Sequence, residues 1–85
     1  MLKPQILNLI KSAIGKQVTI RLDRYTTITG VIDSCEFVKW RNRGGDRICV
    51  FKMYLIAGEA KVRHCLIVER LPWRDGCTIT GKFSE

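Results

Sequence analysis

The segment from Lys39 to Arg47 concentrates cations around one aromatic side chain and a flexible turn. It reads Lys-Trp-Arg-Asn-Arg-Gly-Gly-Asp-Arg, so four cations and one acid surround Trp40. Cationic side chains contact phosphates without reading sequence, and an exposed indole stacks on a nucleobase. The pattern therefore predicts a nucleic-acid-binding segment, with Lys39, Trp40, Arg41, Arg43 and Arg47 as the binding residues. The alternative is a solvated hairpin tip whose Trp40 packs into the core.

Arg63 and His64 are a second candidate pair for contact with a nucleotide. Arg63 offers a planar guanidinium for stacking or for a phosphate, and His64 offers a base stack or a hydrogen bond. A histidine in this setting is also typical of a packed strand residue. Its neighbour Cys65 points to the opposite face of a strand, which disfavours a catalytic dyad. With no spaced carboxylate pair and no Gly-rich phosphate loop, we expect a binding protein and no enzyme.

Cysteine usage indicates neither a metal site nor a cofactor. Zinc sites use closely spaced ligand pairs, whereas the chain has a single histidine and four dispersed cysteines, Cys35, Cys49, Cys65 and Cys77. Free cysteine behaves as a small hydrophobe, so we expect reduced, mostly buried thiols in a cytoplasmic protein. Asn8 and Lys11 interrupt the first apolar runs, and no run approaches the roughly 20 residues of a membrane-spanning helix. We therefore expect no secretory signal and no membrane partner.

Size and charge set the class of protein. The 85 residues suffice for one hydrophobic core, and 46% hydrophobic with 27% charged residues is typical of a folded soluble domain. Fifteen Lys and Arg against eight Asp and Glu give a net charge of +7, which favours polyanions such as RNA, DNA or anionic lipid. Excess charge also keeps small domains soluble, so charge alone selects none of these partners.

Residues 4–14 have the period of an amphipathic helix. Its apolar positions fall on one side of a helical wheel, namely Ile6, Leu7, Leu9, Ile10, Ala13 and Ile14. Pro4 suits the first helical turn, and Gly15 suits a left-handed cap after the last. A membrane-surface anchor would share the positive charge, but the width of the apolar stripe favours packing on a sheet.

From Gln17 the hydrophobic period changes to two, the pattern of half-buried strands. We predict strands over residues 17–23, 27–34, 35–41, 48–56 and 61–71, with a Gly-rich loop over 42–46. Gly30 lies within the second of these, where a lone glycine usually marks a bulge, a bend or a close backbone approach. The fold class is mainly β, an N-terminal helix followed by a five-stranded, strongly bent antiparallel sheet. We place the domain at residues 1–73 and a partly disordered or subunit-edge tail at 74–85, with one possible short strand at 78–80.

This order of elements resembles the Sm and Sm-like family of RNA-binding proteins. In that family the first strand alternates apolar residues, and a glycine follows the last of them by eight positions; here Leu22 and Gly30 match. The segment 62–67, Val-Arg-His-Cys-Leu-Ile, looks like the second family signature, in which an apolar residue, an arginine and a glycine open the fifth strand. The resemblance covers residues 3–71.

The family's uridine pocket is not reproduced. Its aspartate and asparagine positions are occupied here by Glu36 and Trp40, and its second-signature glycine by His64. The resemblance therefore implies the small Sm-like or SH3-like barrel and ring assembly, but not uridine specificity. In the family, rings form between the fourth strand of one subunit and the fifth of the next, which here implies residues 48–56 as an assembly edge.

The favoured hypothesis is a homo-oligomeric Sm-like ring that binds single-stranded RNA, or DNA, in nucleic-acid processing or chaperoning. A ring would repeat one weak contact per subunit and so raise avidity. The alternatives are a structural or protein-interaction ring whose basic surface meets an acidic protein, and a monomeric SH3-like or oligonucleotide-binding barrel.

Overall fold

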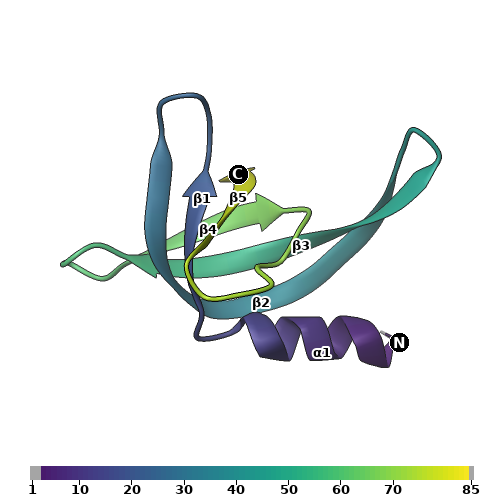
Figure 1. Cartoon of the computed structure of the whole chain (residues 1–85), viewed down its shortest axis with the longest axis horizontal. Coiled ribbons are helices and arrows are strands. Elements are labelled where there is room, and N and C mark those ends of the chain that lie inside the picture. Colours follow the sequence, from purple (N-terminus) through teal and green to yellow (C-terminus); the bar gives the residue numbers. More distant parts are fainter. Residues whose placement is uncertain (1–2, 85) are drawn as a thin grey trace.

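The computed structural model, which describes residues 3–84, is a closed five-stranded barrel preceded by one helix (Figure 1). Its elements are α1 (Pro4–Ala13), β1 (Gln17–Arg21), β2 (Thr27–Arg43), β3 (Asp46–Ala57), β4 (Val62–Val68) and β5 (Cys77–Phe83). Neighbouring strands pair antiparallel in chain order, and β5 closes the barrel by pairing parallel to β1. The predicted fold class, a small mainly-β barrel with a leading helix, is confirmed.

Two of the predicted strands are one strand. Residues 27–34 and 35–41 form the continuous 17-residue β2, which bends without a turn. The pairing of β2 with β3 shifts register between Ile32 and Ser34 and again between Phe37 and Lys39. A β-bulge bends and twists a strand while its pairing continues. The boundary that the sequence analysis drew between two strands is therefore a bend within one strand, taken up by two bulges.

The fifth strand comes from the segment predicted as a tail, which corrects the domain boundary at residue 73. Cys77 and Ile79 are buried, and Val18 of β1 is the register partner of Cys77. Gln17 anchors the connection before β5, because its backbone N–H donates to Asp75 Oδ1 at 2.6 Å and its carbonyl accepts from the Gly76 N–H at 2.7 Å. The short apolar alternation at 77–79 thus completes the barrel instead of lying at its margin.

The helix contributes a narrower apolar stripe than its sequence suggests. Ile6, Ile10 and Ala13 are buried, with Ile6 and Ala13 spaced seven residues apart along one side of the helix. The remaining apolar positions are 41–54% exposed, namely Leu7, Leu9 and Ile14. They flank the contact with the barrel, where α1 lies against β2 (Figure 1).

Gly30 allows β2 and β3 to approach closely, one of the three roles that the sequence suggests for it. A Cβ atom at this position would overlap the carbonyl oxygen of Ile56, a backbone atom that moves only with its strand. We expect Gly30→Ala to lower the free energy of unfolding by about 1–3 kcal/mol, the usual cost of overpacking. Urea unfolding followed by circular dichroism measures it. The control is Val31→Ala at the neighbouring, 45% exposed position, and equal stability of the two variants would contradict the close approach.

Beyond the barrel, β2 and β3 continue as a two-stranded arm, which we define as residues 38–50. The arm leaves the barrel because β3 pairs with β4 only over Phe51–Ala57. Its turn consists of Gly44 and Gly45, both with positive φ, at 55° and 88°. Two-residue hairpin turns of this kind require φ above zero at both positions, which glycine adopts without strain. The sequence therefore ends the arm in a tight turn that carries arginines on either side.

Candidate nucleic-acid interface

The arm presents its cations on both faces. Side chains alternate along a strand, so beyond the bulge at Val38 the side chains of Lys39, Arg41 and Arg43 share one face. Trp40 lies on the other face. Arg47 of β3 also belongs to that face, because its register partner is Asn42, two residues from Trp40. All five arm residues predicted from sequence are thus brought together, divided between two faces.

Arg41 and Arg43 share one carboxylate. Glu69, just after β4, accepts from Arg41 Nη1 at 2.7 Å and from Arg43 Nη2 at 2.6 Å. The side chains of Arg41 and Glu69 are about one third and one quarter exposed, whereas that of Arg43 is 61% exposed. One negative charge faces two positive ones, so the group keeps a net positive charge. Glu69 also orients both guanidinium groups, which lowers the entropy lost when they bind an anion.

Trp40 is neither enclosed nor free. It is 36% exposed, and the Arg47 guanidinium carbon lies 4.4 Å from the centre of its ring, in cation–π contact. The Phe37 ring meets it edge-on, with 5.6 Å between ring centroids. Regular alternation along β2 would place Phe37 on the face of Lys39, but the bulge at Val38 moves it to the face of Trp40. The indole is therefore packed against Phe37 at its side and covered on one face by the Arg47 guanidinium.

Arg63 and His64 lie apart from the arm. The register partner of Arg63 on β3 is Ile56, nine residues beyond Arg47, or about 30 Å of strand. Arg63 stacks on the Tyr54 ring at 4.0 Å and pairs with Asp33 at 3.3 Å. The half-buried His64 ring lies 6.2 Å from that of Phe83. The structure thus gives both residues local partners and does not join them to the arm.

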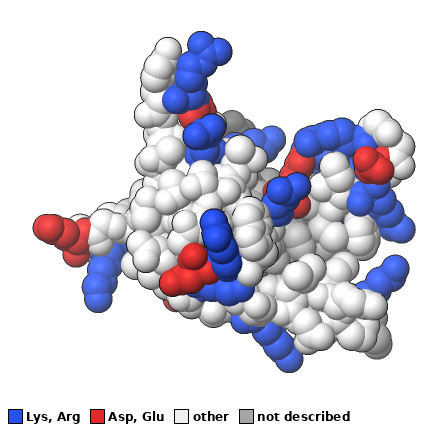
Figure 2. Space-filling view, in the orientation of Figure 1, with Lys and Arg blue, Asp and Glu red and all other residues white. Residues whose placement is uncertain are grey.

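An open cleft lies between the arm, the end of β1 and the chain around β5. Its volume is about 850 Å³, and four arginines but only one acidic residue line it, a net charge of +3. We call it the arginine cleft; its charged residues are Arg21, Arg43, Arg47, Arg70 and Glu69. Its uncharged lining residues, which we call the floor, are mostly apolar and include Leu9, Ile48, Phe51, Leu71 and Ile79. Figure 2 shows Lys and Arg side chains on both raised hairpins and on the surface between them.

Arg21 and Arg70 were not among the residues predicted from sequence. Arg21 is the last residue of β1, and Arg70 is the second residue after β4, 49 positions further along the chain. The alternation of β1 marks Arg21 as outward-facing, which was the available signal. The residues next to Arg21 and Arg70 in the sequence do not indicate that the two lie on the same side of the barrel as the arm. That placement depends on β5, which closes the barrel.

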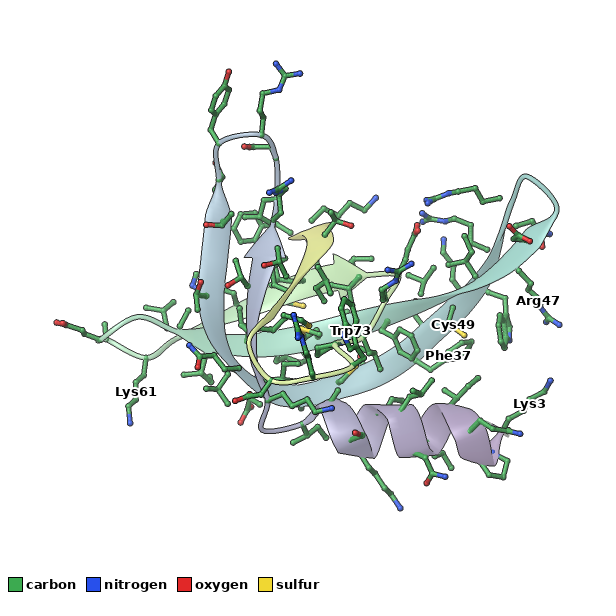
Figure 3. All side chains as sticks on the ribbon, in the orientation of Figure 1. Lys3, Phe37, Arg47, Cys49, Lys61 and Trp73 are labelled. Atoms are coloured by element: carbon green, nitrogen blue, oxygen red, sulfur yellow. The ribbon has the colours of Figure 1, made fainter. Side chains whose placement is uncertain are left out.

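The four cysteines are free thiols, with Cys77 buried and the others half-buried. Burial, assisted by the charge of Glu36, raises the pKa of the Cys35 thiol to about 11. Burial also raises the pKa of Cys49, against the opposing charges of Arg47 and Lys3 (all three are labelled in Figure 3). These two thiols are therefore protonated at neutral pH and are poor nucleophiles.

Two further features bear on the kind of ligand. Within residues 3–84, no three or more His, Cys, Asp or Glu side chains are grouped closely enough to hold a metal ion. In the same part of the chain, α1 is too short to cross a bilayer, and no other helix is present that would. Comparison with models of protein families, with curated proteins and with solved structures finds no significant match.

Proposed function

We propose that the protein binds single-stranded nucleic acid, RNA or DNA, along the arm and the arginine cleft. One observation carries the proposal: four arginines against one carboxylate line an open cleft, and one of them, Arg47, lies over the ring of the 36% exposed Trp40 on the arm. Excess positive charge in a cleft attracts a phosphate chain, and an aromatic beside it binds the bases of that chain. Of this combination, Trp40, Arg43 and Arg47 were predicted from the sequence, and Arg21 and Arg70 were not.

Phosphates would take the guanidinium groups, and one base would take the indole. Arg47 covers Trp40 at 4.4 Å, so it must move aside for a base to stack there. A cation–π contact at an exposed site contributes about 0.5–1 kcal/mol, less than the roughly 1–3 kcal/mol of a base stack. The released guanidinium is then free to pair with the neighbouring phosphate. Exchange of Arg47 for a base is therefore favourable for both groups.

The floor of the cleft favours an unpaired strand over a duplex. Leu9 and Ile48 among others give it an apolar surface, and Thr78 and Thr80 add hydroxyl groups. In a duplex the faces of the bases are stacked on one another, so the protein could reach phosphates, sugars and base edges but no free base face. An unpaired strand can place bases on the floor while its phosphates follow the arginines.

Ring assembly remains a prediction, and less of the predicted assembly edge, residues 48–56, is free to pair with a second subunit than the sequence suggested. Residues Phe51–Ala57 of β3 pair with β4 on one side and largely with β2 on the other, so this part of the predicted assembly edge is occupied within the chain. The described part of β3 that lacks β4 as a partner is Asp46–Val50, in the arm. A second subunit that added a strand there would lie beside the proposed site.

The direct test is a fluorescence-anisotropy titration of a labelled, mixed-sequence single strand with the purified protein at low salt. We expect saturable binding that unlabelled single-stranded RNA or DNA displaces and that a duplex of equal charge displaces poorly. Poly-glutamate serves as the competitor for the alternative function, capture of an acidic protein. Absence of binding, or displacement by poly-glutamate as effective as by the strand, would refute the proposal.

A further inference from the structure

The loop between β1 and β2 stands on the same side of the barrel as the arm (Figure 1). Its tip carries Arg24 and Tyr25, and Tyr25 is 88% exposed, more than any other large hydrophobic residue in the described part of the chain. Exposure of a whole tyrosine ring leaves apolar area in water that burial would have removed. A partner can therefore contact the Tyr25 ring without first displacing it from other side chains of the protein.

The loop is braced by hydrogen bonds. Asp23 Oδ1 accepts from the backbone N–H groups of Tyr25 and Thr26, at 2.8 and 2.9 Å. The Leu22 N–H closes the loop by donating to the Thr26 carbonyl at 2.9 Å. The hydrogen bond from the Tyr25 backbone lowers the pKa of the Asp23 carboxyl, which is therefore ionised and able to accept at neutral pH. The backbone beneath the Tyr25 ring is thus ordered before any partner arrives, which reduces the entropy cost of binding.

The loop continues directly from the arginine cleft. Arg21, which lines the cleft, is the last residue of β1, and the loop begins with the next residue. Arg24 is exposed at the tip, beside Tyr25. Cations therefore extend from the cleft to the tip of the loop on one continuous stretch of chain. The cleft lies between two raised hairpins, each of which carries an aromatic ring and arginines near it.

We propose that Arg24 and Tyr25 form a second contact for the same single strand, which runs from the arm through the arginine cleft to the β1–β2 loop. The inference rests on the proposed function and extends it by a site and by a minimum ligand length. A base stacks on the exposed Tyr25 ring while Arg24 and Arg21 contact the phosphates that lead to it. The composition of the loop favours a nucleic acid over a membrane, because the tip residues beside Tyr25 are Asp23, Arg24 and Thr26, which insert poorly into lipid.

The test compares Tyr25→Ala with wild type on a short and a long strand, of about 4 and about 16 nucleotides, the range that single small barrels cover. The short strand fills the arm and the cleft, and the long strand also reaches the loop. We expect Tyr25→Ala to weaken binding of the long strand by at least about fivefold, the lower limit for one lost base stack, and binding of the short strand by less than about twofold. Tyr25→Phe, which keeps the stacking ring, is expected to bind both strands as the wild type does.

Trp73→Ala is the matched control, because Trp73 is 60% exposed on the loop before β5 and does not line the cleft (Figure 3). Equal affinities of wild type and Tyr25→Ala for the long strand, or an equal loss on both strands, would overturn the inference while leaving the proposed function in place. Failure of the wild type to bind either strand would overturn both. Loss of binding to vesicles of anionic lipid by Tyr25→Ala, with binding to the long strand unchanged, would assign the loop to a membrane instead.

Discussion

Replacing Arg43 and Arg47 together by glutamate is expected to weaken the binding of a single strand by about 100-fold. Each guanidinium–phosphate hydrogen bond contributes about 1.5–3 kcal/mol, and the lower value applies at these exposed positions. Two lost bonds then give about 3 kcal/mol, and each introduced carboxylate adds repulsion from the phosphates. Both residues line the arginine cleft, so the double variant reverses the sign of half of its cations. Fluorescence anisotropy at fixed salt measures the change.

The control for this double variant is Lys11→Glu with Lys61→Glu, which makes the same change in net charge elsewhere. Lys11 lies on α1, and Lys61 lies at the β3–β4 turn, at the opposite end of the molecule from Arg47 (Figure 3). We expect the control to weaken binding by less than about fivefold, through long-range charge alone. Equal losses in the two double variants would show that net charge attracts the strand without a defined site.

Replacing Trp40 by alanine is expected to weaken binding by roughly 5- to 30-fold, because one base stack of about 1–3 kcal/mol is lost while the Arg47 contact no longer has to be broken. Trp40→Phe should restore part of the affinity, since a smaller ring still stacks. The aromatic Trp73, 60% exposed and outside the cleft, supplies the matched control in Trp73→Ala. Circular dichroism melting checks that loss of the Phe37 contact leaves the barrel folded.

An affinity of Trp40→Ala equal to that of wild type would contradict a base on the indole. Binding at the arm would then depend on phosphates alone, without a base stack. Quenching of the Trp40 fluorescence on titration with an unlabelled strand, compared between wild type and Trp73→Phe, reports on the same contact without altering it.

Local patterns in the sequence predicted the elements better than their connections. The helix at 4–14, the alternation from Gln17 and the glycine turn were readable because each depends on neighbours within a few residues. The continuity of β2 was not readable, because two bulges interrupt the regular alternation of the strand near the boundary that was predicted between two separate strands. The strand β5 was not readable either. Its apolar alternation is short, and the strand is stabilised by parallel pairing with β1, some 60 residues earlier in the chain.

The same limit applies to the site. Trp40 and the arm cations were predicted from one contiguous segment, and the structure does bring them together. Glu69 was not predicted as their partner, because the bond from Arg41 to Glu69 joins residues 28 positions apart. Arg21 and Arg70 enter the cleft only through closure of the barrel. Arg63 was suggested by a resemblance in sequence, and its pairing with Asp33 and Tyr54 became visible only in three dimensions.

The measurement that bears most directly on the arginine cleft is the salt dependence of its affinity for a single strand. If its four arginines each neutralise one phosphate, the logarithm of the association constant should fall with the logarithm of salt concentration with a slope of about −3. The slope should be about half as steep for the Arg43→Glu and Arg47→Glu double variant. A slope near zero for the wild type, or one that the double variant leaves unchanged, would contradict phosphate binding by the cleft.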